Sequence, residues 1–215
     1  MDNRAFGVGL RLAKLKGSYP PADQVFAAAG VGNRERAVLA RLWISEGIPF
    51  AFRKCPGLYE EVRNWLAAEL ELDAKEISVA GSGRLGYSLA PKRWGQRYRP
   101  ESSDLDFFAV SASLFERLRG DFDRWRADFT QGILRPKQGE QRNWEANRME
   151  TPRSIGRGFI DSWRVPNRLA YGEFLRMNRR LEELSVRLRR TEPAPKPPKA
   201  PSLRCYRDWG SYERR

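Results

Sequence analysis

The chain has 215 residues and a formal net charge of +13, and it contains no histidine. The length suits one compact domain, or one domain with an extended tail, and the apolar share of 40% is enough for a core. The lack of histidine excludes Ser-His-Asp and Cys-His catalysis, and zinc sites with histidine ligands. Acid–base or metal chemistry therefore has to rest on carboxylates, Lys, Tyr or the metal itself.

The excess of cations, most of them Arg, favours a polyanionic partner, because guanidinium groups contact phosphate bidentately and stack on bases. Nucleic acid is the first expectation, and a basic protein that is merely soluble or docks on an acidic protein stays open. No apolar run is long enough for a membrane helix, and Met1-Asp2-Asn3-Arg4 lacks the pattern of a signal peptide. Because no secretory signal is recognised, we expect a cytoplasmic location, and Cys55 and Cys205, which form no CxxC motif, are expected to be free thiols rather than a disulfide. Because no membrane helix is predicted, we expect no membrane partner.

Hydrophobic periodicity and turn residues predict alternating helices and strands. The expected elements, in chain order, are a helix from Asn33 to Leu42 or Ile44, a helix at 58–72, a strand at 77–80, a loop at 87–103, a strand at 104–110, a helix from Ser111 or Ser113 to 129, a polar irregular segment at 130–154, a strand or a tight structural segment at 158–161 and a basic amphipathic helix at 167–190.

A glycine-rich segment, Gly81-Ser82-Gly83-Arg84-Leu85-Gly86, follows the first predicted strand and matches the dinucleotide fingerprint G-x-G-x-x-G. Pro91, Gly95 and Pro100 argue against that interpretation, because they leave little room for the helix that must follow the glycines. A P-loop is excluded, since no Gly-Lys-Ser/Thr follows. The glycines instead allow a loop whose N–H groups face a triphosphate, with Ser82 as a further donor and Arg84 as an added positive charge. A plain turn is the alternative.

Two acids, Asp104 and Asp106, begin the second predicted strand. Side chains two apart on a strand share a face, whereas Leu105 points into the core. Two carboxylates on one face repel each other unless a cation lies between them. Mg²⁺ prefers a few carboxylates, phosphate oxygens and water as ligands. Two such ions can stabilise the attacking and leaving oxygens of a phosphoryl transfer. The alternative is an acid at a loop end that caps a turn.

Together the two segments resemble the DNA polymerase β-like nucleotidyltransferase superfamily, whose signature is an apolar strand, Gly-Ser and then a strand bearing Asp-x-Asp. The resemblance covers residues 76–111. It implies an α/β (α+β) fold with a small mixed sheet flanked by helices, to which this chain adds helical N-terminal and C-terminal parts. It also implies binding of NTP and Mg²⁺ (or Mn²⁺), and a third catalytic carboxylate on a later strand, for which Asp161 is the candidate. Asp121, Asp123 and Asp128 fall in a predicted helix and are expected to be surface charges.

We expect a nucleotidyltransferase-like domain at 1–190, with its core at about 58–165 and the long basic helix at 167–190. Residues 191–201 contain five prolines among Ala and Lys, which is typical of a polyproline spacer outside the core. Residues 202–215 form a basic and aromatic tail. This tail either docks on its own domain as an edge strand or binds a partner.

A basic insert separates the two halves of the signature and mixes cations with aromatic rings, which suits phosphate contact and base stacking. Its candidate nucleic-acid-binding residues are Lys92, Arg93, Trp94, Arg97, Tyr98 and Arg99. A solvated loop is the alternative.

The expected function is metal-dependent transfer of a nucleoside monophosphate from an NTP to a hydroxyl, with an RNA or tRNA end favoured. The alternative is a catalytically degenerate subunit of the same fold. It would bind nucleic acid or a partner protein in a bacterial antiviral defence or toxin–antitoxin assembly, with the spacer and the Arg-rich helix as docking elements. The two hypotheses differ in whether a third carboxylate joins Asp104 and Asp106.

Overall fold

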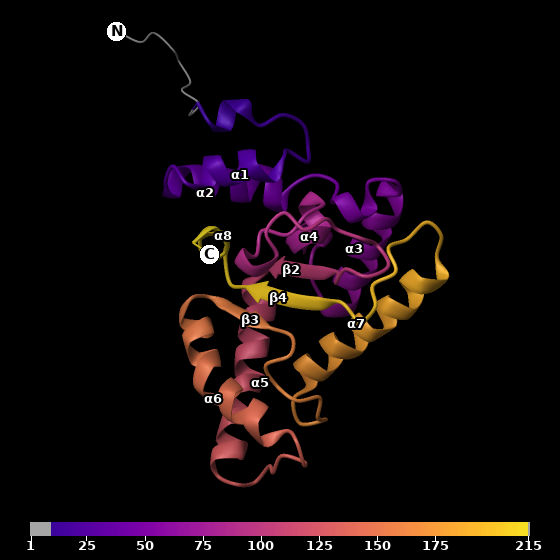
Figure 1. Cartoon of the computed structure of the whole chain (residues 1–215). Coiled ribbons are helices and arrows are strands. Elements are labelled where there is room, and N and C mark those ends of the chain that lie inside the picture. The colour runs from indigo at the N-terminus through magenta and orange to yellow at the C-terminus, as the bar shows by residue number, and fades with distance from the viewer. Residues whose placement is uncertain (1–9, 215) are drawn as a thin grey trace.

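The computed structural model describes residues 10–214, so the N-terminal residues 1–4 considered above lie outside the described range. The helices, shown in Figure 1, are α1 (Ala22–Ala29), α2 (Asn33–Leu39), α3 (Pro56–Leu70), α4 (Gly81–Leu85), α5 (Ala112–Thr130), α6 (Gln141–Gly156), α7 (Gly172–Arg190) and α8 (Trp209–Glu213). The strands are β1 (Ile77–Ala80), β2 (Asp106–Val110), β3 (Phe159–Asp161) and β4 (Ser202–Tyr206). A π-helical turn, Ala40–Ser45, extends α2, and short 3-10 turns occupy Leu12–Lys14, Phe50–Phe52, Ala74–Glu76 and Pro91–Arg93.

The four strands form one mixed sheet in the order β1-β2-β4-β3. β1 pairs with β2 antiparallel, β2 with β4 parallel, and β4 with β3 antiparallel. The expected α+β class, with a small mixed sheet flanked by helices, is confirmed. The antiparallel β1–β2 pair also excludes a dinucleotide-binding unit, because that unit joins parallel strands through its helix.

Alternation along the strands gives the sheet two different faces. On one face Val79, Phe107 and Cys205 enter the main core, which α3, α5 and α7 cover. On the other face, Phe108 stacks on Tyr212 of α8 with ring centroids 4.6 Å apart. This second face also carries Asp106, and the π-helical turn and α8 cover only its far part.

The N-terminal helices form a helical addition at one end of the molecule, above the sheet in Figure 1. Leu12, Leu15, Val25, Ala28 and Leu39 build a small core of their own there, separate from the main one. Both cysteines are free, as expected.

The C-terminal segment differs most from its prediction. Residues 202–206 are neither tail nor edge strand: they form β4, which lies between β2 and β3 inside the sheet. The preceding spacer is also part of the fold. Ala194 is buried in the main core, and Lys196 N donates to Pro100 O at 3.1 Å. The domain therefore extends through the C-terminal residues that the structure describes.

Two helices also differ from their prediction. α6 occupies most of the segment that we expected to be irregular, because Trp144 packs edge-on against Trp125 and Phe129 and so anchors a polar helix. α7 begins at Gly172 rather than 167. Its first amides donate to Asp121 Oδ2, from Glu173 N at 2.8 Å and Phe174 N at 3.3 Å. Asp121 is therefore a buried helix cap, not the expected surface charge.

Candidate functional site

The two halves of the predicted signature meet at one end of the β1–β2 pair. Asp106 pairs with Ala80, the last residue of β1, and Gly81 follows at once. A Cβ atom added to Gly81 would lie 3.6 Å from Asp106 Oδ2, and Gly81 has a φ of +61°, which favours glycine. The first turn of α4, with the partly exposed Ser82, therefore lies beside the Asp106 carboxylate.

The glycine segment itself is a short helix, so the expectation of a loop without a helix was wrong. Gly83 allows α4 to pack closely on the strands, since a Cβ there would lie 3.1 Å from Val79 Cγ1 and 3.3 Å from Leu105 Cδ1. Gly86 ends the helix with a φ of +90°, and a Cβ there would lie 2.8 Å from the Phe50 ring. Close packing therefore explains why positions 83 and 86 are glycines, and no bound dinucleotide is needed to explain them.

Arg84 does not belong to the site surface. Its side chain is 1% exposed, and Nη1 donates to Ile48 O at 2.8 Å, away from the acids. Burial lowers the pKa of its guanidinium. Arg84 thus supports the chain that precedes α3, and its predicted contact with a triphosphate is corrected.

Each of the two acids already has one partner, and both partners come from the segment that leads into β4. Lys199 Nζ lies 3.1 Å from Asp104 Oδ2. Ser202 Oγ donates to Asp106 Oδ1 at 2.7 Å. The Asp104 side chain is 34% exposed, so its carboxylate remains accessible to solutes. One oxygen of each acid is left for a further ligand.

Asp161 does not join them. It lies on β3, paired in register with Arg204 of β4, and β4 separates it from β2. Since neighbouring strands are about 4.8 Å apart, the two strands that carry Asp161 and Asp106 are separated by roughly 10 Å. Asp161 is not placed to complete the predicted catalytic set.

An ion pair occupies the Asp161 carboxylate. Arg204 Nε donates to Asp161 Oδ1 at 2.5 Å, and Arg164 Nε lies 3.8 Å from Oδ2. Burial acts to lower the pKa of Arg204, but the hydrogen bond and the charge of Asp161 outweigh it and raise that pKa. Asp161 is thus the buried partner of an arginine and has a structural role.

The donor set was tested for its fit to the predicted metal. Within residues 10–214, no three Asp, Glu, Cys or His side chains are placed to hold an ion together. Each of the two carboxylates has one oxygen without a protein partner in the described part of the chain. Such a small donor set suits a single Mg²⁺, because proteins usually bind this ion through one or two carboxylates and leave its other positions to phosphate oxygens and water. The two carboxylates do not match a pair of bridged ions, which needs more carboxylate oxygens. Asp106 at the start of β2 and Asp104 just before it therefore offer ligands for at most one divalent ion.

The basic insert is exposed except for one residue. Tyr98 is 5% exposed, so its ring cannot be an open stacking platform as predicted. Trp94 is 41% exposed and packs edge-on against Phe26 at 5.0 Å. The remaining cations of the insert are Lys92, Arg93, Arg97 and Arg99. All four are exposed, and none forms an ion pair with another residue of 10–214.

The Arg-rich helix α7 is different, because three of its six arginines form ion pairs. Arg176 Nη2 lies 2.8 Å from Glu173, and Arg180 Nε lies 2.7 Å from Glu69 of α3. Arg187 pairs with Glu183 at 2.6 Å. The pair with Glu69 links α7 to α3, and the other two lie within α7. Half of the arginines of α7 are thus compensated, which leaves the insert as the better candidate for contact with a polyanion.

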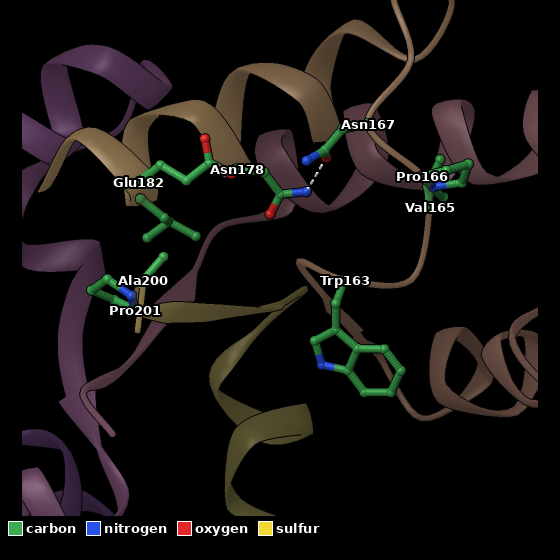
Figure 2. A pocket seen from close by; sticks show the side chains of 9 residues that line it. Trp163, Val165, Pro166, Asn167, Asn178, Glu182, Ala200 and Pro201 are labelled. Atoms are coloured by element: carbon green, nitrogen blue, oxygen red, sulfur yellow. Dashed lines mark hydrogen bonds between the residues drawn. The ribbon is translucent and has the colours of Figure 1, made fainter. Parts of the chain in front are cut away.

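A hollow of about 310 Å³ lies beside the segment that holds the two acids. Ala200 and Pro201 line it, and they lie in the chain between Lys199 and Ser202. Figure 2 shows Asn178 Nδ2 donating to Asn167 Oδ1, at 2.6 Å, across one wall of this hollow. Trp163, on another wall, is 56% exposed, and Arg164 Cζ lies 4.1 Å from its ring centroid.

Sequence reasoning missed Lys199, Ser202 and Arg204, which all come from the C-terminal segment and contact the predicted acids. A usable signal was present: Ser202 and Arg204 alternate with the apolar Leu203 and Cys205, which is the period of a half-buried strand. The prolines before them favoured a spacer and obscured this pattern.

Comparison of the chain with family models, characterised proteins and solved structures found no match. Among the helices of residues 10–214, none combines the length and the apolarity needed to cross a membrane.

Proposed function

We propose that the chain binds an NTP together with one Mg²⁺ (or Mn²⁺) and transfers the nucleoside monophosphate to a hydroxyl at the end of an RNA, tRNA included. The observation that carries this proposal is the closeness of the Gly81 backbone to the Asp106 carboxylate, since a Cβ added to Gly81 would lie 3.6 Å from Asp106 Oδ2. It places the start of α4, which carries Ser82, beside Asp106 at one end of the sheet, with Asp104 just before β2, in the sequence order of the nucleotidyltransferase signature.

The roles follow from the chemistry of each side chain. Asp104 and Asp106 would hold the ion through the oxygens that Lys199 and Ser202 leave free. The ion, when bound, neutralises phosphate charge. The Ser82 hydroxyl donates to a phosphate oxygen, and Lys199 adds a positive charge at the same place.

The reaction needs no further reactant. The acceptor oxygen bonds to the α-phosphorus, the bond from that phosphorus to the bridging oxygen breaks, and pyrophosphate leaves with the electron pair. The acceptor proton passes to solvent, because no third carboxylate of residues 10–214 lies at the site.

That same missing carboxylate favours a second candidate function. Arg204 holds Asp161 away from the other acids, as expected for a catalytically degenerate subunit. Such a subunit would bind nucleic acid or a protein partner, within a bacterial defence or toxin–antitoxin assembly, and would transfer nothing. The uncompensated cations of the insert support nucleic acid as its ligand.

A labelling assay separates the two candidates. The chain is incubated with each of the four NTPs, labelled at the α-phosphate, with Mg²⁺ or Mn²⁺ and with total cellular RNA and protein. Transfer predicts label on RNA that disappears in Asp104→Ala and persists in Asp123→Ala, which removes an exposed acid of α5. Labelling that survives Asp104→Ala would refute the site. Salt-sensitive RNA binding without labelling, retained in Asp104→Ala, would support the degenerate subunit.

A further inference from the structure

A second and larger hollow, of about 450 Å³, lies between the C-terminal end of α4 and the chain that leads into α1. Four aromatic residues line it: Tyr19, Phe50, Tyr87 and Tyr98. The backbone of the basic insert closes one side at Gly95 and Arg97. The hollow is therefore built from the insert, the N-terminal addition and α4 together.

The aromatic walls are fixed before any ligand binds. The Tyr19 hydroxyl donates to Ile48 O at 2.8 Å, and the Tyr87 hydroxyl donates to Pro20 O at 2.6 Å. Tyr19 and Phe50 meet edge to face, with ring centroids 5.4 Å apart. Side chains that are already ordered lose little entropy when a ligand binds.

Cations border these rings. Arg97 lines the hollow, and Arg53 Cζ lies 3.6 Å from the centroid of the Phe50 ring. Neither arginine forms an ion pair with a residue of 10–214. The insert contributes four cations between 92 and 99 and no acid. Cations of the insert and Arg53 therefore lie at the border of the hollow, where the charges of Asp23 and Glu101 also act on Tyr87 and Tyr98.

Tyr98 contributes to the wall, but its side chain is almost fully buried. Its hydroxyl is buried and has no hydrogen-bond partner among residues 10–214. Burial, together with the charge of Glu101, raises the pKa of Tyr98 to about 12, so the hydroxyl is protonated at neutral pH.

We propose that this hollow receives an unpaired base of a single-stranded RNA, and that Arg53 and Arg97 contact the phosphates on either side of that base. Fixed aromatic rings beside unpaired arginines are the combination by which proteins bind single strands, since every base has a face that stacks. A duplex cannot enter in this way, because its bases are stacked inside.

The same placement identifies the bound strand as the acceptor, a step that rests on the proposed transfer. α4 has one end at Asp106 and the other at the hollow. Five helical residues span about 7 Å at 1.5 Å each, so the base site and the metal–nucleotide site are close neighbours. A strand held in the hollow can direct its end towards Asp106.

Binding is tested on the whole chain without NTP, by fluorescence anisotropy of a labelled oligouridine at several salt concentrations. Arg97→Ala is expected to weaken binding several-fold and to reduce the salt slope by about 0.7, the value for one lost phosphate contact on a single strand. Tyr19→Leu is expected to weaken binding on the order of tenfold with an unchanged slope, because stacking is lost. Tyr19→Phe keeps the ring and should bind like the wild type.

Arg142→Ala is the matched control for charge, because it removes one exposed arginine from α6. The proposal predicts wild-type binding by this variant. Equal losses in Arg97→Ala and Arg142→Ala would overturn it, as would wild-type binding by both Arg97→Ala and Tyr19→Leu, or equal competition by a duplex of the same length. If Tyr19→Leu is shown by circular dichroism to be unfolded, the exposed Arg97 position decides the outcome.

Failure of this inference is distinguishable from failure of the proposed function. If label is still transferred from NTP to RNA but the substitutions of Arg97 and Tyr19 leave RNA binding unchanged, only the proposal of an RNA-binding hollow is overturned. If RNA binding depends on both residues but the chain binds no NTP, the proposed transfer reaction is overturned and the proposal of an RNA-binding hollow stands.

Discussion

Ser202 lies directly opposite Asp106 on the neighbouring parallel strand, and its hydroxyl donates to Asp106 Oδ1 at 2.7 Å. Because residues paired across two strands share a face, a carboxylate at position 202 would stand beside Asp106. In this chain a neutral hydroxyl fills that position. Position 202 is therefore a place from which a third carboxylate could reach an ion at Asp106. Because serine occupies it, only the carboxylates of Asp104 and Asp106 are available among residues 10–214, which suits one ion rather than two.

The substitution Ser202→Asp should supply the missing carboxylate. We expect it to tighten Mn²⁺ binding roughly tenfold, equivalent to about 1.4 kcal/mol, since a third anionic oxygen would face the ion. Isothermal titration calorimetry with Mn²⁺ measures this directly. Ser18→Asp, which adds an exposed acid elsewhere, should leave the affinity unchanged. No gain over that control would contradict the assignment of the ion to Asp106.

Arg204→Ala should destabilise the fold. It would leave the Asp161 carboxylate, whose side chain is 7% exposed, with only Arg164 at 3.8 Å. Removing one partner of a buried ion pair costs about 3–5 kcal/mol, which urea denaturation would show as a lower free energy of unfolding. The exposed pair Arg187–Glu183 offers a comparison, and Arg187→Ala should cost less than about 1 kcal/mol. Similar losses in the two variants would argue against a structural role for Asp161.

The raised pKa of Tyr98 predicts a specific dependence of stability on alkaline pH. Burial raises this pKa from 10.0 to about 12, so between these values the unfolded chain loses the phenol proton while the folded chain keeps it. The contribution to stability is therefore complete below pH 10 and is lost as the pH rises to 12. Urea midpoints across this range should fall, and fall less in Tyr98→Phe. An identical decline in both proteins would show that Tyr98 ionises freely in the fold.

The local parts of the fold could be predicted from the sequence. β1 and β2 are short apolar runs bounded by glycine and charged residues, and α3, α5 and α7 bury regular apolar faces, so each pattern is complete within its own segment. The contact of Gly81 with Asp106 belongs to the same category, because both residues lie at one end of an antiparallel pair.

The long-range parts could not be predicted. β4 pairs with strands far back in the chain and follows a proline-rich segment, so nothing local indicates that it divides β2 from β3. The distance of Asp161 from the site is a consequence of that insertion. α6 was missed because its burial depends on Trp144 meeting rings of α5, and its own sequence is mostly polar and contains Pro152.

The central claim is that Asp104, Asp106 and the start of α4 bind a metal–nucleotide complex. Calorimetric titration of the chain with each NTP, with and without Mg²⁺, tests it most directly when wild type, Asp106→Asn and Asp123→Asn are compared. We predict that at least one NTP binds only with Mg²⁺, that Asp106→Asn weakens this binding by at least about tenfold, or 1.4 kcal/mol, and that Asp123→Asn does not. Binding that is independent of Mg²⁺, or equal in the wild type and Asp106→Asn, would contradict the claim.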